Sequence, residues 1–285
     1  MKKWMWCVSA VLSFSGLSQA ASLSIAGFQN PESVLYDAQQ DVYLVSNING
    51  DSFARDNNGF VAVVSPEGKI LNDHWIAGNT NGVILHAPKG MAFAGNVLYV
   101  ADLDAVRLFD RKTGAHLRDV NIKSTFLNDV ATDAKGNVYV SDTGILPDFS
   151  PSGTAAIYQI SGKDQVKVLA QGPELGLPNG LLVQPDGRLL VAPMGAVSLY
   201  ELKNGVPVPW VNLTAAGMDG LVQVGKDVLV SVWNTQSVFK VNPKGEASVV
   251  ASNISSPADL GWDSKRNRLL VPVLMENRIL FQDLD

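Results

Sequence analysis

PESVLYDAQQDVYLVSNI, residues 31–48, is the first of six copies of one pattern: a short apolar strand, a polar turn and a second apolar strand. The other copies begin at Pro88, Leu127, Pro178, Met218 and Pro257. A polar or small residue stands second in each copy, and these residues are Glu32, Lys89, Asn128, Asn179, Asp219 and Ala258. Strand–turn–strand units that recur every 40 to 50 residues or so are typical of a β-propeller. The sequence therefore predicts an all-β fold with six blades.

Each copy is followed by two further apolar stretches, such as residues 106–110 and 116–122 after the second copy. Their content of Val, Leu and aromatic residues is typical of strands, so each blade should have four. The last repeat has only three strands before Asp285. We expect residues 22–28 to supply the missing outer strand and to close the ring, which removes an open sheet edge. The alternative is a loose N-terminal tail. No stretch has a sustained helical period, so almost no helix is expected.

Composition and the first twenty residues indicate an exported globular protein. The 285 residues are 46% hydrophobic and 17% charged, which excludes an intrinsically disordered chain. The net charge of −5 argues against nucleic-acid binding. Residues 1–20 read as a signal peptide, because Lys2 and Lys3 precede an apolar stretch that ends at Ala20. The alternative is an uncleaved N-terminal anchor.

Cleavage after Ala20 leaves residues 21–285 as a single propeller domain. It also removes Cys7, the only cysteine, so the mature chain has no disulfide. We expect a periplasmic or secreted monomer that does not contact the membrane after cleavage.

The second residues of the copies form a candidate metal site. In a propeller the innermost strands surround a central channel, so equivalent positions form a ring at one mouth. Glu32, Asn128, Asn179 and Asp219 would bring two carboxylates and two amides together there. Such oxygen ligands suit one divalent cation, with Ca²⁺ as first choice and Mg²⁺, Mn²⁺ or Zn²⁺ as alternatives. The simpler interpretation is that Asn179 and Asp219, each followed by glycine, are turn residues.

Other residues are candidates for lining the same mouth. Asp142 ends the second strand of the third repeat and could either contact a ligand or cap a loop. His86 precedes the second repeat and could be a proton carrier or a packed side chain. Two insertions, residues 48–59 and 144–154, follow the second strands of the first and third repeats. Loops in such places often set ligand specificity.

Four short motifs occur in a fixed order along the repeats: PES at 31–33, LNDV at 127–130, PNGLL at 178–182 and MDGLV at 218–222. This order resembles the senescence-marker-protein/gluconolactonase family of six-bladed propellers. It is also similar to the diisopropyl-fluorophosphatase, paraoxonase and strictosidine-synthase-like propellers. The resemblance covers essentially the whole mature chain. It implies that Glu32, Asn179 and Asp219 hold a metal and that Asn128 binds metal or substrate.

The resemblance also implies hydrolysis of a small-molecule lactone or related ester. The cation would polarise the carbonyl group, with Asp219 or Asp129 as the general base for water. Members that hydrolyse sugar lactones have Arg-x-Asn-Asp in the third repeat, whereas Phe126 stands in the arginine position here. A phenyl ring donates no hydrogen bond, so a more apolar substrate is expected. Arg55, in the first insertion, could replace the missing arginine.

Two other functions remain open at this point. One is a non-catalytic propeller of the NHL-repeat kind, which binds a small ligand or a protein. The other is a phosphotriester hydrolase, which the same set of oxygen ligands could support. The fold alone does not separate them, because function depends on the site.

Overall fold

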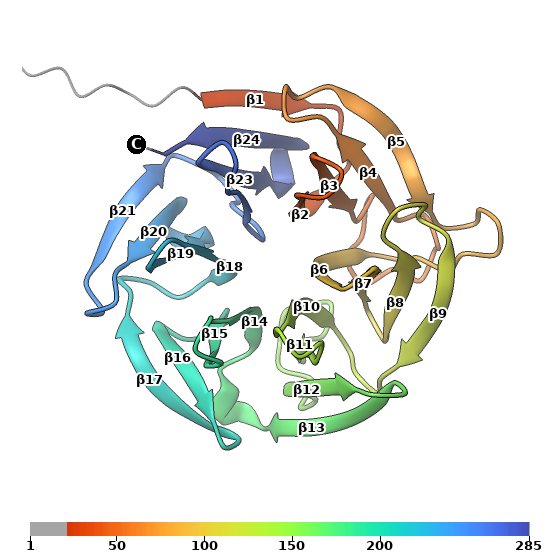
Figure 1. Ribbon diagram of the computed structural model, residues 1–285. Helices are drawn as coiled ribbons and strands as arrows, with labels where there is room; N and C mark the ends of the chain where they lie inside the picture. Colours follow the sequence, from red (N-terminus) through yellow and green to blue (C-terminus); the bar gives the residue numbers. More distant parts are fainter. Residues whose placement is uncertain (1–21, 285) are drawn as a thin grey trace, which may run out of the picture.

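The computed structural model describes residues 22–284, so the predicted signal peptide at 1–20 lies outside the described residues. These residues form six four-stranded antiparallel sheets around a central channel (Figure 1). This confirms the expected six-bladed β-propeller. Helix is limited, within the same residues, to three short 3₁₀ turns at Pro173–Leu175, Trp233–Thr235 and Leu274–Glu276.

In each blade the strands are named in their order from the channel outward. Blade one contains β2 (Pro31–Asp37), β3 (Val42–Asn47), β4 (Phe60–Val64) and β5 (Ile70–Ala77). Blade two contains β6 (Pro88–Ala94), β7 (Val97–Asp102), β8 (Ala105–Asp110) and β9 (His116–Asn121), and blade three contains β10 (Leu127–Thr132), β11 (Val138–Asp142), β12 (Ala156–Ser161) and β13 (Gln165–Gln171). Blade four contains β14 (Pro178–Val183), β15 (Leu189–Pro193), β16 (Ser198–Lys203) and β17 (Val206–Asn212). Blade five contains β18 (Met218–Val224), β19 (Asp227–Val232), β20 (Ser237–Val241) and β21 (Ala247–Ser252), and blade six contains β22 (Gly261–Asp263), β23 (Arg268–Val273), β24 (Arg278–Asp283) and β1 (Ser22–Ala26).

The N-terminal strand β1 closes the ring. It pairs antiparallel with β24, from Ser22 opposite Gln282 to Ala26 opposite Arg278. It is therefore the outermost strand of blade six, as the sequence predicted (Figure 1). The strand ends before Gly27, whose φ of +107° is not an extended conformation.

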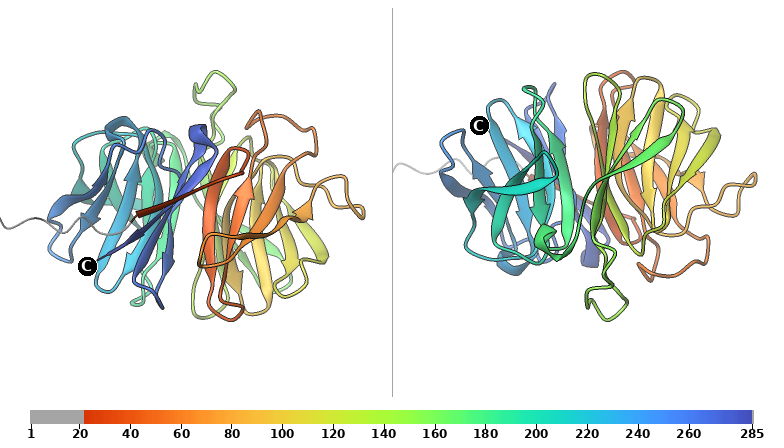
Figure 2. Two further views of the ribbon diagram at one scale, coloured as in Figure 1. Left: turned by 90° about the horizontal axis from the view of Figure 1, so that it is seen from above. Right: turned by 90° about the horizontal axis from the view of Figure 1, so that it is seen from below.

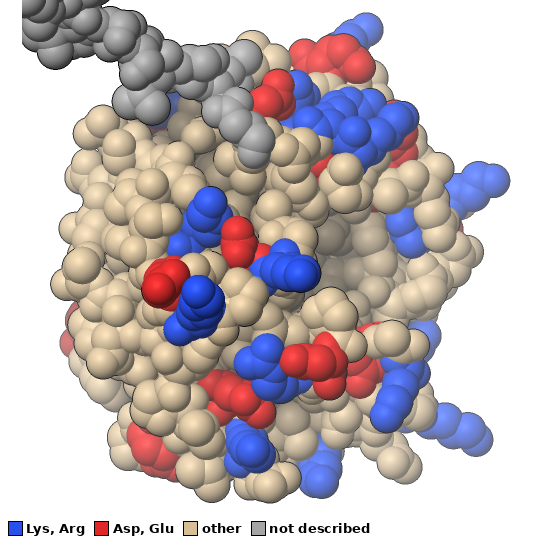
Figure 3. Space-filling view, turned by 60° about the vertical axis from the view of Figure 1, so that its left-hand side comes forward, with Lys and Arg blue, Asp and Glu red and all other residues tan. Residues whose placement is uncertain are grey.

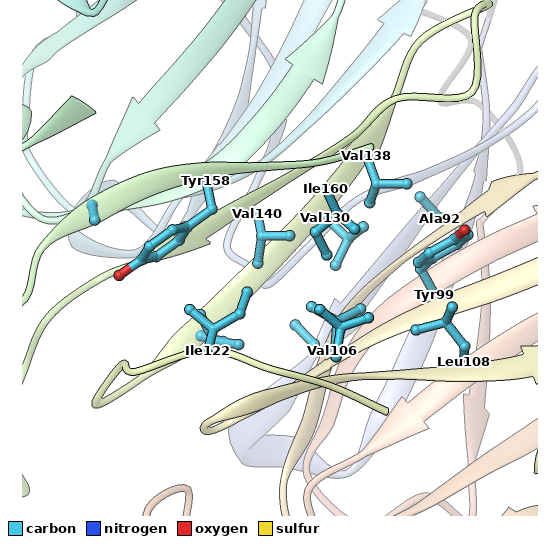
Figure 4. Packing of buried hydrophobic residues seen from close by; sticks show 14 residues of the cluster. Ala92, Tyr99, Val106, Leu108, Ile122, Val130, Val138, Val140, Tyr158 and Ile160 are labelled. Carbon is cyan, nitrogen blue, oxygen red and sulfur yellow. The ribbon is translucent and has the colours of Figure 1, made fainter. Parts of the chain in front are cut away.

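Apolar side chains fill the spaces between neighbouring blades. Leu44 and Val45 are adjacent in β3, yet they belong to different clusters, Leu44 toward blade two and Val45 toward blade six. Figure 4 shows the cluster between blades two and three, which includes Val106 of β8 and Val140 of β11. The inner strands are thus apolar on both faces because a blade covers each face.

The same irregularity occurs at the start of five inner strands. Pro31 of β2 pairs with Asn47 of β3, but the regular register begins only at Val34. Equivalent shifts occur in β6, β10, β14 and β18. A β-bulge of this kind bends a strand and redirects its side chains. The bulges contain the residues that were predicted to form the ring: Glu32, Lys89, Asn128, Asn179 and Asp219.

Three of the bulges, at Gly90, Gly180 and Gly220, require glycine because neighbouring inner strands approach closely. A Cβ on Gly180 would lie 2.1 Å from the backbone oxygen of Asp219, and one on Gly220 would lie 2.4 Å from the backbone nitrogen of Leu260. None of the three glycines has a positive φ. The glycines in PNG and MDG therefore serve strand packing rather than a left-handed turn.

Serines in two second strands connect these bulges to the next blade. The Ser141 hydroxyl accepts a hydrogen bond from the backbone N–H of Asp129 (2.9 Å) and donates to the carbonyl oxygen of Asn179 (2.7 Å). Ser231 links Gly220 to Ala258 in the same way, at 2.8 Å each. Each hydroxyl accepts a hydrogen bond from a backbone N–H in a bulge and donates one to the next blade, so it joins two blades beside the ring.

The two insertions leave the blades at the ring end of the channel. Residues 48–59 follow Asn47, which pairs with Pro31 at the start of β2. Residues 144–154 follow Asp142, which pairs with Leu127 at the start of β10. Figure 2 shows both loops projecting from the same face, as the sequence predicted.

The surface over blades five and six carries charges of both signs. Lys and Arg side chains lie among Asp and Glu in Figure 3, and Arg268 and Arg278 pair with Asp283 and Glu276 at 2.6 Å each. Within residues 22–284, no helix has the length and apolar character needed to cross a membrane.

We expect a chain that begins at Gly27 to be less stable than one that begins at Ser22. Its loss of β1 leaves the edge of β24 unpaired and uncovers part of the apolar packing of blade six. Thermal unfolding followed by circular dichroism should show a melting temperature lower by roughly 5 °C or more. Equal melting temperatures for the two chains would contradict the role of β1 in closing the ring.

Ser231→Ala should destabilise the propeller by about 1–3 kcal/mol, because the buried N–H of Gly220 loses its acceptor. Urea unfolding measures this difference. Ser248→Ala removes an exposed hydroxyl from β21 and is the matched control, with an expected change of less than about 0.5 kcal/mol. Equal effects of the two substitutions would show that the hydroxyl of Ser231 does not stabilise the ring.

Candidate functional site

Five polar side chains occupy equivalent positions at one mouth of the channel. Each is the second residue of its inner strand and is no more than 5% exposed; they are Glu32, Lys89, Asn128, Asn179 and Asp219. We call these five residues the ring. The four predicted metal ligands are all members. Strands β6 and β18 lie opposite each other across the channel (Figure 1), so Lys89 and Asp219 stand on opposite sides of the ring.

Three of the predicted ligands carry a buried oxygen without a hydrogen-bond partner. The side chains of residues 22–284 contain five such atoms, and three of these are Oε2 of Glu32, Oδ1 of Asn128 and Oδ1 of Asp219. An unpartnered buried polar atom costs about 1–3 kcal/mol, and native proteins contain few of them. Their gathering in one ring fits a divalent cation, which binds hard oxygen ligands.

Neighbouring side chains hold the other polar atom in two of these groups, Asn128 and Asp219. Nδ2 of Asn128 donates to Oγ1 of Thr143 at 3.0 Å, and this hydroxyl donates to the carbonyl oxygen of Pro178 at 2.9 Å. The indole N–H of Trp233 donates to Oδ2 of Asp219 at 2.7 Å. Each of these groups therefore keeps one free oxygen. Sequence reasoning missed Thr143 and Trp233, although both follow a second strand directly.

The donor set is mixed rather than purely acidic. Within residues 22–284, no group of three His, Cys, Asp or Glu side chains lies close enough to hold a metal ion. The ring contributes two carboxylates, from Glu32 and Asp219, so the amide oxygens of Asn128 and Asn179 would have to complete the coordination.

Burial and mutual repulsion disfavour the charged forms of the ring carboxyls. Burial, followed by the charges of Asp219 and Asp259, raises the pKa of Glu32 well above its usual value. Burial and the charge of Asp259 raise the pKa of Asp219 to about 7, although the Trp233 hydrogen bond acts in the opposite direction. Such shifts are expected where like charges share a site that excludes water. Protons or a cation must balance this charge.

Lys89 places one ammonium group in the ring. Its Nζ donates to the carbonyl oxygen of Ala87 at 2.9 Å and lies 4.2 Å from the ring centre of Phe126. Burial lowers the pKa of Lys89 to about 8, whereas the charges of Glu32 and Asp102 act in the opposite direction. Sequence reasoning placed Lys89 at the equivalent position of the second repeat but gave it no role. It missed the positive charge that Lys89 contributes.

Two further carboxyl groups lie one residue beyond the ring. Asp129 accepts hydrogen bonds from the backbone N–H groups of Val130 and Leu181, each at 2.6 Å. Asp259 accepts one from the Ser33 hydroxyl at 2.6 Å. Burial raises the pKa of both carboxyls, that of Asp259 to about 7.

The position of Asp129 bears on its predicted role as a general base. It lines, with Asp259, a cavity of about 310 Å³ between the later residues of the inner strands, away from the ring mouth. Both its carboxylate oxygens already bind backbone amides. The observed contacts therefore make it a link between blades three and four.

An apolar cluster surrounds the mouth at the level of the loops. Its members come from blades one to four and blade six: Ile48, Ala87, Leu103, Phe126 and Ile145, with the half-buried Phe53, Leu177, Met194 and Leu274. The ring centre of Phe53 lies 4.6 Å from that of Phe126 and 6.0 Å from that of Phe149. Phe53, Phe126 and Phe149 form an aromatic cluster in which the two insertions meet.

Asp142 has the contacts of a loop cap. It is fully buried, and its Oδ1 accepts hydrogen bonds from the backbone N–H groups of Phe126 (2.9 Å) and Gly144 (3.0 Å). Of the two interpretations of Asp142, these contacts favour the structural one. Asp142 thereby fixes the backbone at Phe126.

Arg55 and His86 lie outside the ring, in the loops around the mouth. Arg55 forms an ion pair with Asp104, and both side chains are exposed. Nδ1 of His86 accepts a hydrogen bond from the backbone N–H of Asn57 at 3.1 Å and so fixes the first insertion. Substrate binding by either residue stays a prediction.

Comparison with known proteins extends this description. Residues 30–258 match the family model described as the SMP-30/gluconolactonase/LRE-like region. None of the curated proteins matches the sequence significantly.

Solved structures share the fold at low sequence identity. A gluconolactonase from Xanthomonas campestris has 16% identity and a TM-score of 0.70, covering 94% of this chain and 91% of its own. Virginiamycin B lyase from Staphylococcus aureus has 10% identity and a TM-score of 0.66, covering 94% and 100%. The calcium-binding protein regucalcin from Agrobacterium tumefaciens has 14% identity and a TM-score of 0.65, covering 90% of each chain. At these identities the likeness concerns the fold, whereas the family match spans most of the sequence. The chain therefore belongs to the SMP-30/gluconolactonase/LRE-like family.

Proposed function

We propose that this protein is a cation-dependent hydrolase of lactones or related esters that carry an apolar substituent. The observation that supports it best is the set of three unpartnered buried oxygens on Glu32, Asn128 and Asp219. With the Asn179 amide they would hold one divalent cation, with Ca²⁺ as first choice. That cation would polarise the substrate carbonyl as a Lewis acid.

The chain's own residues then have distinct tasks. Trp233 holds Oδ2 of Asp219 and leaves Oδ1 free for the cation. The Asp219 carboxylate is also the candidate acceptor for the proton of the attacking water. Thr143 orients the Asn128 amide so that its oxygen is the free atom. Asp129 is the weaker candidate base, since both its oxygens are already bound.

The aromatic cluster supports an apolar substrate. Phe126, Phe53 and Phe149 offer no hydrogen bond, so the hydroxyl groups of a sugar lactone would lose their water without gaining a partner. An alkyl or aryl substituent would instead bury apolar area against these rings. Because the ring residues are almost fully buried, a substrate must displace part of this cluster, and Phe149 at 63% exposure is its outermost member.

Family membership supports a hydrolase, and the gluconolactonase among the structural neighbours agrees with it. The lyase with the same fold shows that the fold alone does not decide the reaction. We also propose that the protein is exported. Cleavage after Ala20 would leave β1 intact, and N-terminal sequencing of the mature protein tests this.

We expect chelation to lower the melting temperature of the wild-type protein and one divalent cation to restore it. Binding to the native state alone stabilises by mass action, so at about 100 times the dissociation constant the rise should be roughly 5 °C or more. Glu32→Gln keeps the size of the side chain but loses its charge, so its rise should be much smaller. No shift with Ca²⁺, Mg²⁺, Mn²⁺ or Zn²⁺ would remove the main support for the enzyme.

With the restoring cation present, the wild type should hydrolyse members of a panel of alkyl and aryl lactones and esters. Asp219→Asn should lower kcat/KM by roughly 10³-fold or more, because it removes both a ligand and the candidate base. Turnover of phosphotriesters alone would favour the phosphotriester hydrolase. Cation binding without any turnover would favour the non-catalytic binding propeller.

The stability of the chelated protein should fall as the pH rises from about 4 to 7. The raised pKa values of Glu32, Asp219 and Asp259 mean that the native state binds more protons than the unfolded state in this range, so a higher pH favours unfolding. Below about pH 4 both states are protonated and the penalty is absent. Urea unfolding at several pH values measures the trend, which Glu32→Gln should weaken and the bound cation should reduce. A chelated wild type that gains stability across this range would contradict the burial of these charges.

A further inference from the structure

Lys89 has hydrogen-bonding capacity that the described residues do not use. An ammonium group carries three N–H donors, and within residues 22–284 its only hydrogen bond goes to the carbonyl oxygen of Ala87. No ion pair joins it to a carboxylate in the same residues, although it is only 1% exposed. A buried charge without a close partner is costly unless a ligand supplies one.

The ring therefore contains a donor and several acceptors that are held apart. Glu32 and Asn128 flank Lys89 in the strand order, and Asp219 stands across the channel (Figure 1). The Ala87 oxygen and the Phe126 ring fix Nζ on one side, while Trp233 fixes Asp219 on the other. A cation would bind the free oxygens of Glu32, Asn128 and Asp219. The ammonium group of Lys89 would then be the ring group that still needs a hydrogen-bond acceptor.

We propose that Lys89 is a substrate-binding residue whose ammonium donates to the carbonyl oxygen of the lactone or ester and to the carboxylate of the product. This inference rests on the proposed function, whose substrate it places between Lys89 and Asp219. Water would lose its proton on the Asp219 side, and the carbonyl oxygen would gain negative charge on the Lys89 side. A fixed positive charge stabilises that oxygen more strongly in the transition state than in the substrate.

Phe126 contributes to the same arrangement. Its ring lies under the ammonium, where a cation–π contact restrains the flexible lysine chain. The phenyl ring of Phe126 also packs against Phe53 and the other members of the apolar cluster. The phenyl group of Phe126 thus contacts both the ammonium group of Lys89 and the apolar cluster. The site therefore suits a monocarboxylate with an apolar chain. Hexanoate is a suitable product-like probe.

Calorimetric titration of hexanoate into the protein with saturating Ca²⁺ tests the proposal. Lys89→Met removes the charge at nearly constant length and should weaken hexanoate binding about tenfold or more. Lys89→Arg keeps the charge and should retain most of the affinity. Lys244→Met removes an exposed lysine far from the ring along the chain and is the control for net charge, with wild-type affinity expected.

The Ca²⁺ affinity separates a ligand-binding lysine from a structural one. Loss of a positive charge beside Glu32 should make Lys89→Met bind Ca²⁺ more tightly, by about tenfold, because the charges no longer repel. On an active substrate, Lys89→Met should lower kcat by roughly 10²-fold or more. If Lys89→Met binds hexanoate within twofold of wild type, or loses Ca²⁺ and hexanoate together, the proposal is overturned.

A measurement on the wild type covers the case in which Lys89→Met does not fold. In protein labelled with ¹⁵N at the lysine Nζ atoms, the ammonium signal absent from Lys89→Arg belongs to Lys89. Hexanoate should shift this signal, and an unmoved signal at saturating hexanoate would overturn the assignment. If hexanoate binding depends on Lys89 but no lactone or ester is hydrolysed, the proposed hydrolase fails while the binding role of Lys89 stands.

Discussion

Close approach of the inner strands around the channel is the constraint on which the rest of the structure depends. At Gly180 and Gly220 the next blade lies so near that no Cβ fits, and the Ser231 hydroxyl bridges the remaining gap. The bulges that permit this contact also turn the preceding side chains toward the channel. The polar ring is thus a direct consequence of how the blades pack.

That packing buries several carboxyl groups close together, and their negative charge must be balanced by a bound cation or by protons. Glu32, Asp129, Asp219 and Asp259 are buried together, and Lys89, whose charge opposes the rise in the pKa of Glu32, lies beside only one of them. Backbone amides and the Ser33 hydroxyl satisfy the two deeper carboxyls, but Glu32, Asn128 and Asp219 each keep one oxygen without a donor. Burial and the neighbouring negative charges raise the pKa values of Glu32 and Asp219, so protons take the place of the cation when it is absent.

Much of this arrangement could be predicted from the sequence because the repeats impose it. Six copies of one pattern gave the blade number, the short last repeat indicated closure by β1, and Glu32, Asn128, Asn179 and Asp219 followed from equivalent positions. The bulges could not be predicted, because register depends on contacts between strands. The role of Lys89 could not be predicted, because it depends on its contacts with Ala87 and Phe126. Asp259 was not recognised as part of the site, because the equivalent ring position in its repeat is occupied by Ala258. The second strands nevertheless contained a signal for the bridging serines. The dipeptide Val-Ser directly precedes the polar strand ends at Asn47 and Asp142, and it occurs again at residues 230–231, shortly before Trp233.

The relation between the ring and the loops determines what the site can select. The ring lies at the bulged starts of the inner strands, where the packing of six blades fixes each side chain. The aromatic cluster lies in the two insertions, where Phe53 and Phe149 depend on loop conformation. Phe126 belongs to both parts, because Asp142 fixes its backbone while its ring contacts Lys89 and Phe53. A change in the insertions would therefore alter which substituents fit while leaving the cation site intact. Substitution at Phe126 would affect both, because this residue connects the ammonium group to the apolar wall.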